Sequence, residues 1–290
     1  MAEATITGLF DLAVSSGSST TLLGSGPNGG SEVTFGISDD LGNGLKATAA
    51  LTVVGAATSM QDSNGGLGFG MYNSYVGIEG DFGSIKAGAQ WSPVFLIDTI
   101  GEVTGRWNSA SQATPNELQN FNSVTYTSPS ISGFTLSYQT QLTDSTATTD
   151  NDYNFNETGG HATAYSLKYA NDAFTAGYGH SKDDNYNWAG TTVQTTVMAA
   201  SYDFGVVKLT YGHLVTDKVA PGTNVTSNQY GVSVPFGAWV FGAQNSSNDS
   251  GDTTNSYIAN YSMSKKTTVY FANTDASGTK TNQLGIKMAF

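Results

Sequence analysis

The chain has no cysteine, a single arginine and no long apolar run. Without cysteine it has no disulfide framework, no thiol nucleophile and no zinc–thiolate site. No segment approaches the roughly 20 consecutive apolar residues that a membrane-spanning helix requires. These absences exclude a disulfide scaffold and a helical membrane protein.

Charge is also scarce, because charged residues make up 12% of the chain, about half of the roughly 25% typical of soluble domains. The 11 basic and 23 acidic residues give a net charge of −12. Nucleic-acid binding requires the opposite sign, so we expect no nucleic-acid partner. An aromatic content of 11% argues against intrinsic disorder.

The residues that are present follow a period of two. Ile6, Phe10 and Val14 share one parity with Gly8 and Leu12, and the chain ends with the same alternation. Such alternation predicts β-strands. We count about 16 segments, which suits a large antiparallel barrel, near residues 3–15, 31–38, 45–55, 71–79, 84–91, 121–128, 133–142, 162–170, 173–181, 192–202, 206–213, 226–234, 237–245, 255–262, 267–273 and 282–290.

The connections between these segments alternate in length. Tight turns rich in Gly, Asn, Asp and Pro, such as 39–44 and 202–205, separate longer loops near 15–31, 56–70, 92–121, 143–161, 181–191, 213–226, 245–254 and 273–281. Short turns at one end and long loops at the other are typical of outer-membrane barrels. We therefore predict an all-β chain forming one domain over 1–290, a 16-stranded antiparallel transmembrane β-barrel.

The alternative is a soluble or surface-attached β-sandwich acting as a lectin or adhesin. A sandwich needs a charged solvent face, whereas the polar parity here is mostly Thr, Ser, Asn, Gln and Gly. Tyr and Trp also gather near strand ends, as at Tyr72, Trp91, Tyr126 and Tyr261. Amphipathic rings near strand ends would lie at the two membrane–water interfaces of a bilayer. We therefore expect the barrel to be embedded in a lipid bilayer.

Several segments resemble the general porins of Gram-negative outer membranes, especially the trimeric β-proteobacterial type. They are the opening Thr5–Asp11, the hairpin Ser38–Ala47, the stretch Tyr75–Gly88, the stretch Asn122–Pro129 and the terminal Phe290. The ending resembles the assembly signal of that family. Met1, Ala2 and Glu3 lead directly into the first alternating segment, so we expect a mature chain with an added start methionine.

The resemblance implies a location in the outer membrane of a Gram-negative bacterium and a homotrimer in contact with lipopolysaccharide. It also implies that the third external loop, about residues 92–121, folds into the barrel and narrows a water-filled channel. Small hydrophilic solutes and ions would diffuse through it, and no enzymatic activity is expected.

In wide pores, fixed wall charges and pore diameter set selectivity. Parity places Asp11, Lys46 and Lys86 on the lumen side, and the loop offers Asp98, Glu102, Arg106 and Glu117. These seven are our predicted constriction residues, whereas Lys168, Lys208 and Lys287 are expected to be ordinary solvated lumen side chains. The resembling porins often carry arginine where Ala89 stands here, so the basic wall is thin and we expect a weak preference for cations.

Other chemistry has less support. The acidic clusters 39–40, 150–152 and 183–184 could bind calcium through oxygen ligands, but such residues more often form turns. We therefore expect no metal site and no cofactor. His161, His180 and His213 are far apart in sequence and are expected to be surface side chains.

Two further alternatives stay open at this point. A channel specific for sugars or other uncharged solutes would use the abundant Asn, Gln, Tyr and Trp. A barrel enzyme would need a Ser–His or Asp–His set at the rim, and no such set stands out.

Overall fold

A computed structural model describes residues 2–17, 19–23, 25–26, 29–55, 70–104, 119–142, 162–186, 191–218 and 224–290. It contains 18 antiparallel strands, of which β2 (Thr20–Leu23) and β3 (Ser25–Gly26) are short pieces between β1 and β4. The other 16 form a closed barrel, as predicted. They are β1 (Glu3–Ser16), β4 (Gly29–Gly42), β5 (Leu45–Gly55), β6 (Gly70–Gly80), β7 (Gly83–Trp91), β8 (Gln119–Thr127), β9 (Phe134–Gln141), β10 (Ala162–Ala170), β11 (Phe174–Tyr186), β12 (Thr191–Asp203), β13 (Lys208–Lys218), β14 (Val225–Phe236), β15 (Trp239–Asn248), β16 (Thr253–Ser262), β17 (Thr267–Ala276) and β18 (Thr279–Ala289).

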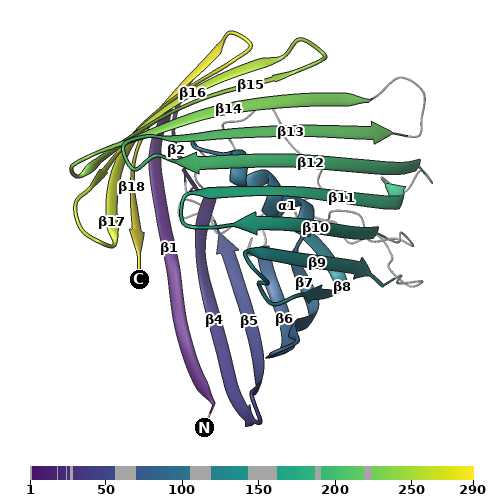
Figure 1. Cartoon of the computed structure of the whole chain (residues 1–290). Coiled ribbons are helices and arrows are strands. Elements are labelled where there is room, and N and C mark those ends of the chain that lie inside the picture. Colours follow the sequence, from purple (N-terminus) through teal and green to yellow (C-terminus); the bar gives the residue numbers. More distant parts are fainter. Residues whose placement is uncertain are drawn as a thin grey trace.

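The barrel closes between the two ends of the chain. Strand β1 pairs with β18 along one edge and with β4 along the other (Figure 1). Phe290 continues this closure, since its backbone exchanges two hydrogen bonds with Gly8 and its ring stacks on Phe10 at 5.7 Å. Closure satisfies the hydrogen-bonding groups that an open sheet would expose at its edges.

Tight turns join the strands at one end of the barrel, which we call the turn end; the opposite end is the loop end. Asn43 and Gly44, both with positive φ, connect β4 to β5, and the Asp40 carboxylate accepts the Gly42 N–H at 2.8 Å. Positive φ at both central residues gives the turn a twist that matches the twist of the flanking strands.

The predicted alternation of short and long connections is wrong in two places at the loop end. Strands β15 and β16 are joined by 249–252, and β17 and β18 by Ser277 and Gly278 alone. The sequence suggested longer loops there because polar residues on both parities hid the continuation of the strands. The predicted loop near 15–31 likewise contains β2 and β3.

The outer face of the barrel is apolar. In β1 the side chains of Ile6, Phe10 and Val14 are 61%, 47% and 48% exposed, while the intervening Asp11 and Ala13 are 0% and 1% exposed. Most of the other strands repeat this arrangement, with exposed apolar side chains such as Ile37, Val76, Leu167 and Leu284 turned outward. Such a face requires surrounding hydrocarbon rather than water. A soluble sandwich is therefore excluded.

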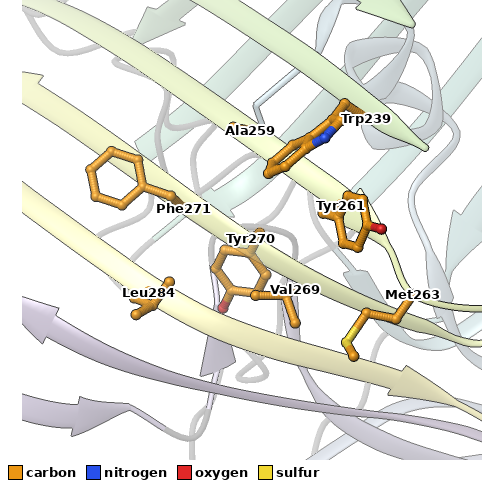
Figure 2. A pocket seen from close by; sticks show the side chains of 8 residues that line it. All are labelled: Trp239, Ala259, Tyr261, Met263, Val269, Tyr270, Phe271 and Leu284. Atoms are coloured by element: carbon orange, nitrogen blue, oxygen red, sulfur yellow. The ribbon is translucent and has the colours of Figure 1, made fainter. Parts of the chain in front are cut away.

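Aromatic rings gather on the outer face near the turn end. Phe134 lies against Tyr169 and Trp239 against Tyr261, each with ring centroids 4.8 Å apart. Beside Trp239 the outer surface of β15–β18 has an apolar hollow of about 320 Å³ (Figure 2). Its lining consists of Trp239, Ala259, Tyr261, Met263, Val269, Tyr270, Phe271 and Leu284. Among the described residues no helix has the length and apolarity to cross a bilayer.

Candidate pore constriction

The connection that follows β7 begins with a short helix. Ser92 caps α1 (Pro93–Asp98) by accepting the Val94 N–H, and Pro93 occupies the first helical turn. Ser is a favoured cap and Pro a favoured first residue of a helix. The 3₁₀ turn η1 (Thr99–Gly101) follows directly. The structure describes this connection as far as Thr104.

This segment lies inside the barrel, where α1 contacts β9–β12 and η1 contacts β11–β14 (Figure 1). Val94 and Ile97 are buried in one cluster with inward-facing apolar residues of β10, β12 and β13, namely Ala164, Val197, Ala199 and Leu214. Because this patch of the inner wall is apolar, covering it with the loop removes it from the water of the lumen. The predicted inward fold of the third loop is thus confirmed for residues 92–104.

Glycines on the inner wall allow the loop to approach closely. A Cβ atom added to Gly177 would lie 2.5 Å from Ile97 Cδ1, and one added to Gly231 would lie 2.5 Å from Val103 Cγ2. At Gly242 it would lie 2.8 Å from Val103 Cγ1. Real Cβ atoms do not make such contacts, so these three positions form a seat for the loop that larger residues would fill.

Hydrogen bonds hold the loop to the same wall. Thr210 donates through its hydroxyl to the Gly101 carbonyl at 2.8 Å. The Gln244 side-chain oxygen accepts the backbone N–H groups of Val103 and Thr104, at 2.8 and 3.3 Å. Sequence reasoning missed Thr210, Gln244 and the glycine seat. Inward-parity glycines on several neighbouring strands were the signal that could have found them.

Two of the predicted loop residues are placed by the structure. Asp98, 3% exposed, ends α1, and Glu102 directly follows η1. Arg106 and Glu117 lie outside the described residues. On β1, Asp11 faces inward and is fully buried, and its carboxylate accepts the Tyr270 hydroxyl at 2.6 Å. The roles of these residues in the constriction stay predictions.

The predicted basic wall is interleaved with acids. Lys86 lies 3.2 Å from the Glu79 carboxylate and 4.7 Å from the centre of the Tyr75 ring. Lys46 stands between Asp40 and Glu79 in the register of β4, β5 and β6. Positive and negative side chains therefore alternate on this wall, near the turn end.

Beyond the apolar patch, the inner wall of the barrel is polar. Buried Gln139 on β9 accepts a hydrogen bond from Asn120 and donates to Thr125 and to the Trp91 carbonyl. Thr34 and Thr52 share a hydrogen bond across β4 and β5 at 2.8 Å. A polar lining is what a water-filled passage requires.

Metal and acid–base chemistry find little support in the described part of the chain. Asp40 caps a turn, and Asp184 pairs with Lys182 at 2.6 Å. His180 and His213 contact Thr196 and Asn228 through their ring nitrogens on the outer face. No group of three or more His, Asp or Glu with metal-binding geometry occurs among the residues that the structure describes. His161 and the acidic cluster at 150–152 lie outside them.

Comparison with known proteins identifies the family. The model of the Gram-negative porin family matches residues 1–281. The chain belongs to the Gram-negative porin family. Membership agrees with the resemblance seen in the sequence, and it places the protein in the outer membrane. Porins are channel proteins rather than enzymes.

Sequence relatives of this porin include the major outer membrane protein P.IB of Neisseria gonorrhoeae, which is 32% identical over 155 residues. The same protein of Neisseria lactamica is 30% identical over 158 residues. Each match covers 51% of this chain, but only 40% and 41% of the relative. The matched region thus spans about two fifths of the length of these curated relatives.

Solved porin structures share the fold along the whole chain. An anion-selective porin from Comamonas acidovorans superposes with a TM-score of 0.77 at 20% identity, covering 100% of both chains. Salmonella typhi OmpF gives 0.73 at 12% identity, covering 100% of this chain and 97% of its own. The trimer form of Vibrio cholerae OmpT gives 0.71 at 10% identity, covering 100% and 99%. At these identities the likeness shows the fold alone.

Proposed function

We propose that this porin forms a water-filled channel for passive diffusion of ions and small hydrophilic solutes. The observation that carries the proposal is the loop segment 92–104, which is seated against one inner wall and faces a polar wall across the barrel. Tyr75, an aromatic ring on that polar wall, is covered by Lys86 rather than offering an open face to a sugar. This favours general diffusion over a sugar-specific channel.

We further propose a weak preference for cations. The chain carries 11 basic against 23 acidic residues, and Lys86 is offset by Glu79 at 3.2 Å. Asp98 and Glu102 add formal negative charge on the loop. Selectivity then differs from that of the Comamonas acidovorans porin, whose name states that it is anion-selective. Fixed wall charge acts on ions within a Debye length.

A homotrimer is the proposed assembly. The outer face of β18, β1 and β4–β7 carries mainly aliphatic side chains, as in the exposed Ile6, Ile37, Val76 and Ile286. The outer face of β9–β16 carries rings instead, as in Tyr138, Tyr165, Tyr230 and Tyr257. A tyrosine ring at the membrane interface keeps its hydroxyl in contact with water, so the face rich in tyrosine suits lipid. The face with few tyrosines suits contact with another subunit. The trimer form of OmpT supports this assembly by analogy.

Lipopolysaccharide is the proposed neighbour of the rest of the outer face at the loop end. There the outward side chains become polar, and amides hydrogen-bond across strands in the pairs Asn245–Asn255 and Asn273–Asn282. Such groups can bond to sugars. Calcium carried on the external loops is not part of the proposal, because Asp40 already caps a turn and Asp184 already pairs with Lys182.

Insertion of the purified protein into a planar bilayer tests the function. Conductance should rise in steps, and each inserted unit should close in three equal sub-steps if it is a trimer. Reversal potentials across a KCl gradient should show a small excess of cation permeability. A protein that leaves the bilayer silent contradicts the channel, and a clear anion preference contradicts the selectivity alone.

A further inference from the structure

The apolar hollow on the outer face of β15–β18 has a floor of short side chains between aromatic rings (Figure 2). Strand register places Ala259 beside Phe271, and Val269 beside Tyr261, all on the outward face of β16 and β17. Ala259 and Val269 therefore form the floor, and the larger side chains rise around it. Because the lining is apolar and the surroundings are hydrocarbon, this hollow can hold part of an acyl chain.

The hollow follows the strands toward the turn end of the barrel. Met263, which also lines it, lies four residues beyond Ala259, a distance of roughly 13 Å along an extended chain. Strand tilt reduces this to a depth of about 10 Å, less than half of an apolar band about 25 Å tall. The hollow therefore lies within the leaflet at the turn end. Trp239 and Tyr261 carry polar ring groups, which suit the headgroup level of that leaflet.

Two lysines stand where the hollow reaches the turn end. Met263 is followed by Ser264, Lys265 and Lys266 in the turn that joins β16 to β17. Both lysines are exposed, and neither forms an ion pair within the part of the chain that the structure describes. The Ser264 hydroxyl oxygen accepts the N–H groups of Lys266 and Thr267, at 3.2 and 3.0 Å, and so fixes the turn. Long lysine side chains at this height can reach the phosphate groups of lipids.

The surroundings of these lysines contain little negative charge. The turns 235–238 and 263–266, which border the hollow, have no acidic residue. The C-terminal carboxylate belongs to Phe290, next to Ala289, whose N–H donates to the Lys266 carbonyl at 2.8 Å. The chain as a whole carries a net charge of −12, which on average repels anionic lipids. A preference for an anionic lipid would therefore have to come from a local basic site.

We propose that the hollow and the two lysines form a binding site for an anionic phospholipid. One acyl chain lies in the hollow, and the phosphate lies beside Lys265 and Lys266. The apolar hollow alone would accept the chain of any lipid, and the lysines add the selection for negative charge. The site lies at the boundary between the tyrosine-rich face and β18, where the face proposed for subunit contact begins. The inference rests on the membrane location of the barrel and not on the proposed channel function.

Quenching of tryptophan fluorescence by brominated lipids tests this site. The porin is placed in phosphatidylcholine vesicles that contain dibrominated phosphatidylglycerol or dibrominated phosphatidylcholine, and the Trp239 signal is the difference between the natural chain and Trp239→Phe. In about 0.05 M salt the association constant should favour phosphatidylglycerol roughly 5-fold, and in about 1 M salt less. Lys265→Gln/Lys266→Gln should bring the ratio close to one. The matched control Lys168→Gln/Lys208→Gln removes the same charge from the inner face near the same end and should keep the preference.

The hollow itself is tested by filling it. Ala259→Leu raises the floor and should weaken the quenching of Trp239 by both lipids, although both lysines remain. Ala200→Leu is the matched control, because Ala200 shares the outward parity of the exposed Met198 and Tyr202 on β12. This control should leave the quenching unchanged.

Three outcomes would overturn the inference. The first is equal quenching by the two lipids in the natural chain, and the second is a preference that survives the loss of both lysines. The third is no quenching of Trp239 by either lipid, which would show that a second copy of the chain covers the hollow. None of these outcomes bears on conduction, so the proposed function would stand. The comparison of the two lipids in the natural chain decides the matter even if a variant does not fold.

Discussion

Two parts of the inner wall of this barrel are built from the same alternating sequence pattern, yet one part binds the inward-folded loop and the other faces the water of the channel. The loop-bearing wall, formed by β9–β15, combines an apolar patch on β10, β12 and β13 with glycines and with the hydrogen-bonding side chains of Thr210 and Gln244, and it holds the segment 92–104. The open wall, formed by β4–β8, carries hydroxyls, amides and alternating charges and stays available to water. Strand periodicity alone makes both walls, while the size and polarity of their inward residues decide which one accepts the loop.

Added bulk on the two walls should change conductance in opposite directions, and this is the largest effect we expect. Gly231→Leu fills the seat beneath Val103 and should displace the loop, raising single-channel conductance by roughly 2-fold. Ala50→Leu, on an inward position of β5, adds bulk to the open wall and should lower conductance. Heat-modifiable gel mobility confirms folding of both variants. Conductance that falls in both would show that the loop is not seated by the glycines.

Loss of the Gln244 acceptor should loosen the loop without filling its seat. Gln244→Leu leaves two backbone N–H groups of Val103 and Thr104 without their acceptor, a cost of about 1–3 kcal/mol. We expect larger current noise and frequent excursions above the main conductance level. Gln244→Glu retains an accepting oxygen and should remain quieter. Identical current noise in the two variants would show that the Gln244 side-chain oxygen does not hold the loop against the wall.

Single charges on the open wall should have the smallest effect. Glu79→Gln releases Lys86 from its ion pair and should shift the permeability ratio toward anions, whereas Lys86→Gln should shift it toward cations. The two side chains are partly exposed, at 27% and 36%. Water and salt therefore screen their charges, and each shift should stay below roughly 2-fold. The double variant should restore the natural ratio in reversal-potential measurements. A double variant whose permeability ratio differs clearly from the natural one would contradict this expectation.

Much of the fold was predictable because its information is local. Alternation in stretches such as Ile6–Val14 identifies a strand and its outward face without any partner. Strand ends were harder to predict, since β17 and β18 continue through polar residues to the tight turn at Ser277 and Gly278. Where a strand extends beyond the part of the barrel that faces hydrocarbon, its outward residues become polar as well. The alternation of apolar and polar residues is then lost, and the sequence of such a strand cannot be told from that of a polar loop.

The candidate site was only partly predictable. Asp98 and Glu102 were placed on the inward loop because that loop is long and its position in chain order matches the resembling porins. The seat at Gly177, Gly231 and Gly242 and the acceptor Gln244 come from strands up to 141 residues distant along the chain, and no local pattern links them to Val103.

By itself, the sequence determined that this chain makes an alternating, sparsely charged barrel with a net charge of −12, because period and composition are local properties. Only the tertiary structure decided that Lys86 is offset by Glu79 and that the loop rests on one wall. Those outcomes depend on register, which brings distant residues opposite each other across paired strands. The same residues in another register would line the channel with a different field.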